Sequence, residues 1–254
     1  MTTAKIAIVT GAAGGICRAT CVRLARSGWT VVAADQNVAE GNQTARMCIE
    51  AGAVAAFRSI DVTDALQMER LVNFAQNEHG RVDGFVNNAG YEGVFASIVD
   101  YPDEIFDRVI AVNLRGAFLG LKHALRVMRA QGSGAVVNVG STSSIRGRNN
   151  VSAYVASKHG VLGLTRAAAA EVAGTGIRVN AVLPGPIETA MTEKLDKLVQ
   201  SAVASGAATG LGRNGQTVYG QPADIAGAVA FLMSSDASHI NGTSLTIDAG
   251  STVS

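Results

Sequence analysis

Short apolar runs alternate with longer amphipathic segments along the whole chain. The apolar runs are predicted to be strands, at residues 6–9, 31–34, 54–60, 84–86, 135–139, 177–182 and 245–247. The segments between them are predicted to be helices, one ending near residue 28 and the others at 38–51, 64–79, 103–130, 152–173 and 223–234. Strands that are apolar on both faces are typical of a parallel sheet covered by helices on either side. The pattern therefore predicts an α/β protein, with one doubly wound, three-layer domain over residues 1–254 and a parallel seven-stranded sheet.

Composition narrows the class of protein further. Hydrophobic residues make up 48% of the 254 positions and charged residues 16%, which predicts a large core. A net charge of +1, without any run of basic residues, predicts neither nucleic acid nor a membrane surface as a partner. No apolar segment approaches the roughly 20 residues of a membrane span or forms a signal-peptide core, so we expect a cytoplasmic protein. Three cysteines and four histidines without ligand spacing predict buried thiols and no metal site.

A glycine-rich turn joins the first predicted strand to the first predicted helix. It contains Gly11, Gly14 and Gly15, followed by Ile16, and the second strand ends in Asp35. In a β-α-β unit of the Rossmann type, such glycines let a pyrophosphate approach the positive end of the helix. An acidic residue at the end of the second strand accepts both ribose hydroxyls and repels a 2'-phosphate. Because no Arg or Lys occupies positions 12, 13, 36 or 37, the sequence favours NAD over NADP.

Tyr154 and Lys158 are four residues apart in a segment predicted to be helical. On one helix face their side-chain roots lie roughly 5 to 6 Å apart, so an ammonium can act on a phenol. A phenol titrates near 10, and a general acid/base at neutral pH needs a pKa about 3 units lower. One neighbouring cation lowers it by about 1 to 3 units. The pair therefore predicts a second positive charge at the site, such as an oxidised nicotinamide.

Two further polar residues are candidates for the same site. Ser141 precedes Tyr154 by thirteen positions, although any of the hydroxyls of residues 141–144 could instead cap the loop. Asn113 lies within the helix predicted at 103–130, where the alternative is that it caps or bends the helix. Ligands of parallel sheets bind beyond the carboxyl ends of the strands, and each motif named so far is expected at that edge.

Together these motifs resemble the short-chain dehydrogenase/reductase family over essentially the whole chain. The turn of 10–15, the Asp61-Val62 pair, the run 87–90, and Pro184-Gly185 followed by Thr189 occur in the family's order and spacing. The resemblance implies that Tyr154 donates or accepts the proton, while Lys158 lowers its pKa and holds the nicotinamide ribose. Ser141 would bind the substrate oxygen, and Asn113 would position a water in the proton relay. The implied NAD site consists of Gly11, Gly14, Gly15, Ile16, Asp35, Asp61, Val62, Asn88, Ala89, Gly90, Tyr154, Lys158, Pro184, Gly185, Ile187 and Thr189.

One position departs from the family pattern, because Cys17 stands where the family's turn usually ends in glycine. A thiol is small and apolar enough to pack at this point. We therefore expect a slight outward displacement of the helix rather than lost binding, and a redox role is the alternative.

The helix predicted at 152–173 is apolar on more than one face, as at Val161, Leu164 and Ala167. Packing on the sheet needs only one apolar face, so this helix is expected to meet another helix. In the family it pairs, together with the 103–130 segment, with symmetry mates. The resemblance therefore predicts a homotetramer.

Substrate specificity is expected to come from the residues after Gly90, the loop between Ser141 and Tyr154, and a glycine-rich mobile lid at about 186–220. For Arg146 and Arg148, beside this site, we expect solvated surface positions, with binding of an anionic substrate as the alternative. A pocket for a modest apolar ketone is predicted from Val94, Phe95, Ile145, Val151 and Met191.

Three functions are compatible with this pattern. The leading one is an NAD-dependent secondary-alcohol dehydrogenase or ketone reductase. The second is a reductase of 3-oxoacyl thioesters, or dehydrogenase of 3-hydroxyacyl thioesters, on a carrier protein. Such enzymes usually use NADPH and basic docking residues, so Asp35 and Thr175 count against it. The third, a non-catalytic NAD-binding scaffold, is disfavoured by the complete catalytic set.

Overall fold

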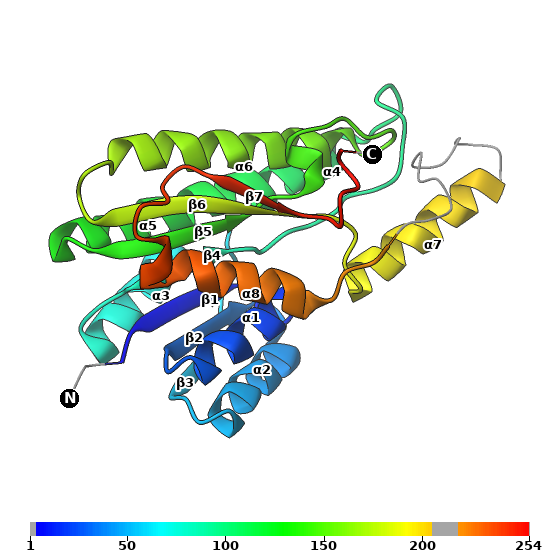
Figure 1. Ribbon diagram of the computed structural model, residues 1–254. Coiled ribbons are helices and arrows are strands. Elements are labelled where there is room, and N and C mark those ends of the chain that lie inside the picture. Colours follow the sequence, from blue (N-terminus) through cyan, green and yellow to red (C-terminus); the bar gives the residue numbers. More distant parts are fainter. Residues whose placement is uncertain (1–3, 205–217, 254) are drawn as a thin grey trace.

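The computed structural model describes residues 4–204 and 218–253. Within these ranges, seven parallel strands form one sheet in the order β3-β2-β1-β4-β5-β6-β7 (Figure 1). They are β1 (Ile6–Thr10), β2 (Thr30–Asp35), β3 (Ala55–Ser59), β4 (Gly84–Asn87), β5 (Gly134–Val139), β6 (Ile177–Pro184) and β7 (Ser244–Ile247). The predicted fold class is confirmed. Neither described range contains a helix that is both long enough and apolar enough to cross a membrane.

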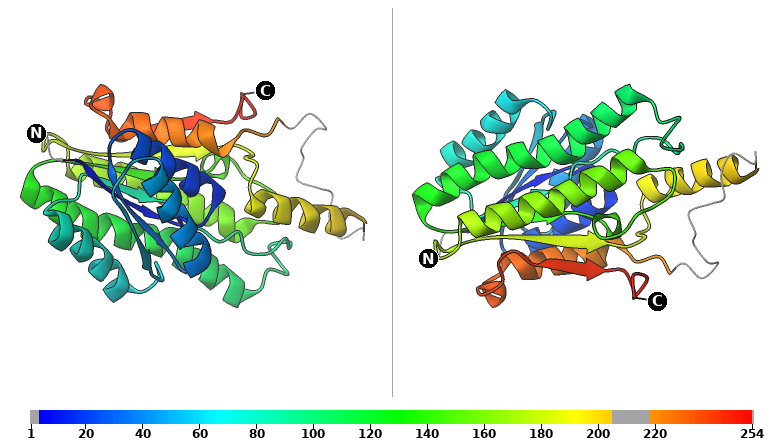
Figure 2. Two further views of the ribbon diagram at one scale, coloured as in Figure 1. Left: turned by 90° about the horizontal axis from the view of Figure 1, so that it is seen from below. Right: turned by 90° about the horizontal axis from the view of Figure 1, so that it is seen from above.

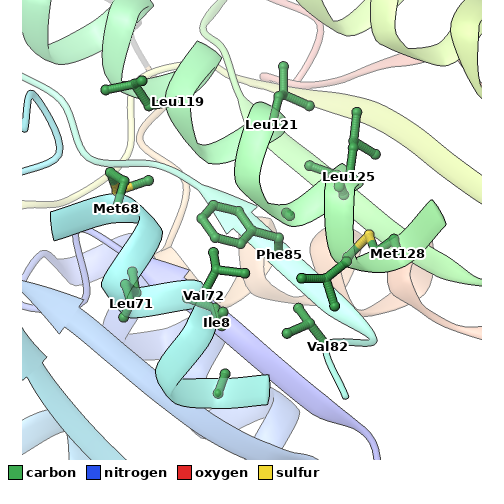
Figure 3. Packing of buried hydrophobic residues seen from close by; sticks show 14 of the residues in the cluster. Ile8, Met68, Leu71, Val72, Val82, Phe85, Leu119, Leu121, Leu125 and Met128 are labelled. Atoms are coloured by element: carbon green, nitrogen blue, oxygen red, sulfur yellow. The ribbon is translucent and has the colours of Figure 1, made fainter. Parts of the chain in front are cut away.

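Helices cover both faces of the sheet (Figure 2). Alternate residues of each strand pack into the two layers, so that Ile8 faces one layer and Val9 the other. Figure 3 shows Ile8 and Phe85 surrounded by side chains such as Leu71 and Met128. This burial on both faces explains the uninterrupted apolar runs of the sequence. One layer is α3 (Ala65–His79), α5 (Gly116–Gln131) and α6 (Ser152–Glu171), and the other is α1 (Gly15–Arg26), α2 (Val38–Glu50) and α8 (Pro222–Met233).

The order of the strands reverses at β1. β2 and β3 lie on one side of β1, and the chain then crosses over to place β4 on the other side. At such a reversal the connections leave in opposite directions and open a crevice beyond the carboxyl ends of the strands. The buried Thr10 hydroxyl joins the two sides, because it donates to Val86 O and accepts from Asn88 N, both at 3.2 Å. The topology thus places the ligand-binding edge between the ends of β1 and β4.

The segment predicted as one helix at 103–130 is divided in the structure. The helix α4 (Asp103–Val109) passes into a π-helical stretch, Ile110–Arg115, before α5 begins. A π-helix differs from an α-helix in its hydrogen bonds rather than in its composition, so the sequence did not separate them. Asn113 lies in this stretch and is only 2% exposed. Short π-helical stretches of this kind are frequent at functional sites.

The predicted lid at about 186–220 contains a helix that the sequence analysis missed. It is α7 (Ala190–Ala204), which extends past the carboxyl edge of the sheet in Figure 1. The glycine-rich part of the lid falls on residues 205–217, which lie outside the described residues. Residues 190–204 contain no glycine, so the glycine-rich composition does not extend to the whole segment. The recurrence of Met191, Leu195 and Leu198 at helical spacing was the signal for the helix.

Candidate active site

The glycine turn places the amino end of α1 at the crevice. α1 begins after Gly14, with no side-chain cap and no acidic residue in its first turn. Gly11 has a positive φ of 71°, and a Cβ at this position would come within 2.9 Å of Ala89 N and of Asn88 Nδ2. Glycine is therefore required here for both conformation and space. The uncapped N–H groups and the helix dipole together form a site suited to a phosphate group.

Asp35 lies next to this helix end. Its Oδ2 accepts from Ala13 N at 3.0 Å and its Oδ1 accepts from Asn37 N at 2.9 Å. A carboxylate offers about four lone-pair positions, so Asp35 retains capacity for two hydroxyl donors. A cation, Arg18, is also close to the turn, but it forms an ion pair with Glu40 and donates to Ala13 O. The donors and acceptors of this region fit an adenine dinucleotide.

The other predicted cofactor segments converge on the same edge. Asn88 is joined to the end of β1 through Thr10, as described above. A Cβ on Gly15 would lie 3.1 Å from Thr189 Cγ2, so the segment between β6 and α7 reaches the start of α1. Val62, after β3, lies against Gly116 at the start of α5. Asp61 is less open, since its Oδ1 closes a turn by accepting from the backbone N–H and the hydroxyl of Thr63.

The helix α6 brings Tyr154 and Lys158 to one face, as the spacing predicts. The Lys158 ammonium lies 5.6 Å from the centre of the Tyr154 ring and donates to Val139 O at 2.8 Å. Ser141 forms a side-chain hydrogen bond with Tyr154. The Ser141 hydroxyl also accepts from Ser143 N at 3.1 Å, so it caps its loop as well as facing the phenol. One hydroxyl therefore both caps the loop and lies beside Tyr154.

The electrostatic environment of Tyr154 favours the neutral phenol. Burial raises the pKa of Tyr154, and this outweighs the Ser141 hydrogen bond and the positive charge of Arg148, which lower it. Burial also lowers the pKa of Lys158 to about 8. A group that must exchange protons near neutrality thus needs a further positive charge beside it, in agreement with the argument from the sequence.

Asn113 connects the loop after β4 to α6. Its Oδ1 accepts from Tyr91 N at 2.7 Å, and its Nδ2 donates to Tyr91 O and to Ser157 Oγ, each at 3.0 Å. The Ser157 hydroxyl in turn donates to Tyr154 O at 2.8 Å. Asn113 therefore orders the loop at the crevice and the first turn of α6, a role that sequence analysis did not assign.

An open hollow of about 630 Å³ borders Tyr154 and Ser141. Of the predicted pocket residues, Val151 and Met191 line it. Val94 instead packs with Tyr101 and Val109, so it belongs to a separate cluster. Ile145 is 46% exposed and, like Phe95, does not line the hollow. The remaining lining residues are Glu92, Thr142, Ser143, Arg148, Gly185, Pro186, Thr192 and Leu195.

The expectation of solvated surface positions for Arg146 and Arg148 is wrong. Both side chains are half-buried. Arg146 donates to Ser251 O at 2.9 Å and so attaches the loop before α6 to the C-terminal segment. Arg148 donates to Thr142 Oγ1 at 3.2 Å and lines the hollow. Long side chains of this kind can cover apolar surface, which the sequence pattern alone does not show.

Cys17 is fully buried in the core between the sheet and α1. Burial, together with the charge of Asp35, raises the pKa of its thiol well above the ordinary value. A buried neutral thiol is a poor nucleophile. The structure thus favours the packing role of Cys17 over the redox alternative.

We expect iodoacetamide to leave the activity of the native protein unchanged, and Cys17→Gly to alter NAD affinity by less than about tenfold, or 1.4 kcal/mol. Mass spectrometry of the labelled native protein and a binding titration of the variant check this. Unfolded protein, in which the thiols react, is the control. Inactivation that Cys17→Ser prevents would instead support a redox role.

Known proteins resemble this chain over nearly all of its length. The family model described as enoyl-(acyl carrier protein) reductase matches residues 11–252. Levodione reductase of Leifsonia aquatica is 41% identical over 251 residues, which cover 98% of this chain and 94% of the relative. Cyclohexanol dehydrogenase of Acinetobacter sp. strain SE19 is 36% identical over 98% of this chain and 95% of the relative. Cis-4-hydroxycyclohexanecarboxylate dehydrogenase of Sinomonas cyclohexanicum is 42% identical over 98% of this chain and 96% of the relative.

Solved structures agree with these relatives. The crystal structure of levodione reductase has a TM-score of 0.92 at 40% identity and covers 98% of both chains. NAD+-bound xylitol dehydrogenase has a TM-score of 0.88 at 33% identity, covering 97% of this chain and 99% of its own. A variant of actinorhodin polyketide ketoreductase with NADPH has a TM-score of 0.87 at 33% identity, covering 97% of each chain.

The chain therefore belongs to the short-chain dehydrogenase/reductase family. It is an oxidoreductase that acts on CH–OH groups with a nicotinamide cofactor.

Proposed function

We propose that this protein is an NAD-dependent dehydrogenase of small cyclic secondary alcohols and a reductase of the corresponding ketones. The observation that carries the proposal is the hydrogen-bonded pair of Ser141 and Tyr154 in the wall of the hollow. The hollow presents apolar surface to a substrate ring, and the names of the relatives include a cyclohexanol dehydrogenase. Its apolar lining comes from Val151, Pro186, Met191 and Leu195.

The side chains divide the proton chemistry between them. In the oxidation direction, Tyr154 accepts the hydroxyl proton of the substrate, and Ser141 hydrogen-bonds the substrate oxygen. Lys158 stabilises the phenolate by its positive charge. Bound NAD supplies the hydride acceptor and, in its oxidised form, the second positive charge beside the phenol.

The proton leaves the site through a second cavity in this proposal. Asn113 and Lys158 both line a narrow space, together with Val139 and Val161. Their polar groups offer hydrogen-bond partners to a water in this space. We assign to Asn113 the positioning of a water that accepts the proton from Lys158.

The cofactor assignments follow the edge of the sheet. Backbone N–H groups of the glycine turn hold the pyrophosphate, and Asp35 accepts from the adenosine ribose. Asp61 and Val62 enclose the adenine. The nicotinamide half contacts Asn88, Ala89, Gly90, Tyr154, Lys158, Pro184, Gly185, Ile187 and Thr189.

We expect Asp35→Ser to lower kcat/KM with NAD by about 10- to 100-fold. A hydrogen bond to a charged group contributes about 1.5 to 3 kcal/mol, and the carboxylate also repels a 2'-phosphate. The variant should therefore use NADP better than the wild type does. Steady-state kinetics with both cofactors measure this, with Asp100→Ser as a control that removes an exposed carboxylate outside the cofactor site. An unchanged ratio of NAD to NADP activity would contradict the role of Asp35.

A panel of substrates tests the proposed activity. It contains cyclohexanol, cyclopentanol, an open-chain alcohol and one 3-hydroxyacyl thioester, each with NAD and with NADP. We expect the highest kcat/KM for a cyclic alcohol with NAD. The description of the family model favours the acyl-thioester alternative, and oxidation of the 3-hydroxyacyl thioester with NADP, in preference to the cyclic alcohols, would establish that function instead.

The assembly and location of the protein remain predictions. We propose a homotetramer in which α6 and the α4–α5 segment pair with their symmetry mates. The outward positions of α6 support this, since Ala156, Gly163, Ala167 and Ala170 are exposed and small enough for a second helix to approach closely. The cytoplasmic location is a prediction from the sequence.

A further inference from the structure

The helix α7 forms one wall of the substrate hollow and carries an ion pair across it. Met191, Thr192 and Leu195 line the hollow. From the same helix, Lys194 reaches across to Glu92, with 3.0 Å between Nζ and Oε1. Glu92 belongs to the segment after β4, about a hundred positions away in the sequence. The ion pair therefore joins two walls of the hollow, α7 and the segment after β4, that are far apart in the sequence.

The two partners differ greatly in their exposure. The side chain of Lys194 is 61% exposed, whereas that of Glu92 is only 12% exposed. An ion pair with one exposed partner contributes little to stability, because water screens it. A carboxylate that is withdrawn from water, however, exerts a strong field on its neighbours when it lacks a counter-charge. The effect of Lys194 therefore depends on which groups lie near the carboxylate of Glu92.

Glu92 faces the catalytic phenol across the hollow. The charged groups around Tyr154 are Lys158 from α6, Arg148 from the loop before α6, and Glu92 from the segment after β4. Within the described residues, Glu92 is the negative one of the three. Its charge raises the pKa of Tyr154, in opposition to Arg148. A phenolate beside an unneutralised Glu92 is therefore disfavoured.

We propose that Lys194 is a positioning residue, which neutralises Glu92 when α7 lies over the hollow and thereby links the seating of this helix to the activation of Tyr154. With Lys194 in place, the phenol faces a dipole rather than a net negative charge. The helix α7 then both encloses the substrate and favours ionisation of Tyr154. This inference rests on the proposed catalytic role of Tyr154.

The test is a titration of Tyr154 in Lys194→Met, Glu92→Gln and the double variant. Phenolate absorbance of the cofactor-bound protein, less that of Tyr154→Phe, reports the pKa directly, and the pH profile of kcat/KM reports it during oxidation. We expect Lys194→Met to raise the pKa of Tyr154 by about 1 unit in both measurements. Glu92→Gln should lower the pKa of Tyr154 in both. In the Glu92→Gln background, the further effect of Lys194→Met should largely disappear. That loss of effect distinguishes action through Glu92 from a direct effect of the lysine.

Two further variants make the result specific. Lys194→Arg keeps the charge and should retain the wild-type profile. Lys197→Met removes a neighbouring exposed lysine of α7 and should leave the pH profile unchanged. Within residues 4–204 and 218–253, Lys197 forms no ion pair. A change in KM without any pH shift would show that the pair only holds the wall and would overturn the proposal. Failure of the wild type on every substrate would overturn the proposed function, whereas the absorbance titration would still decide the role of Lys194.

Discussion

Tyr154→Phe is expected to lower kcat for alcohol oxidation by about 10²- to 10⁴-fold, the usual contribution of a general acid or base. Phenylalanine fills nearly the same space but has no group that exchanges a proton. The helix α6 and its contacts should persist, because Lys158 donates to Val139 O rather than to the phenol. NADH binding, followed by the fluorescence of the reduced nicotinamide, should therefore change by no more than about twofold.

A matched control is available for this substitution. Tyr101 is also largely buried, and its hydroxyl accepts from Val94 N at 3.4 Å outside the hollow. Tyr101→Phe also removes a phenolic oxygen from a largely buried ring and should leave kcat nearly unchanged. Turnover by Tyr154→Phe within tenfold of the wild type would show that another group moves the proton.

Lys158→Ala is expected to weaken both turnover and NAD binding, each by about 10- to 100-fold. The reason is the loss of a charge-assisted hydrogen bond, worth about 1.5 to 3 kcal/mol, together with a positive charge near the phenol. The substitution also removes the Lys158 ammonium that donates to the buried Val139 O. Thermal unfolding should therefore be measured to confirm that the variant is folded at the assay temperature.

The pH dependence of cofactor binding separates these effects of Lys158. Its pKa is lowered from 10.5 to about 8, so the ammonium is present below that pH and is lost as the pH rises through it. NAD binding to the wild type should weaken over this rise, and Lys158→Ala should lack the transition. Lys122→Ala, which removes an exposed lysine of α5, is the control and should keep it. A transition that persists in Lys158→Ala would assign the titration to another group.

Local patterns were sufficient for the sheet and for the side-by-side placement of Tyr154 and Lys158. A strand buried on both faces is largely apolar, so β1 and β5 were recognisable from their runs of apolar residues. The helical pair Tyr154 and Lys158 needs only the i, i+4 geometry of one element. Glycine at position 11 follows from a backbone conformation that other residues rarely adopt.

Contacts between distant segments were beyond these patterns. Arg148 was predicted to be solvated, because a charged residue in a loop usually is, whereas the surrounding fold encloses it in the wall of the hollow. Glu92 and Lys194 each appear as an ordinary surface charge in the sequence, and only the position of α7 brings them together. The helix α7 itself was overlooked beside a glycine-rich stretch.

By itself, then, the sequence determined the strands and most of the helices, the parallel sheet, the glycine turn and the pairing of Tyr154 with Lys158. Each of these depends on interactions within a few residues or on the alternation of apolar positions, which the chain carries locally. The tertiary structure alone decided the electrostatic state of the site. Burial raises the pKa of Tyr154, lowers that of Lys158, and arranges Arg148 and the Glu92–Lys194 pair around the phenol. Such effects depend on distance and on exclusion of water, and both arise only when segments far apart in the chain pack together.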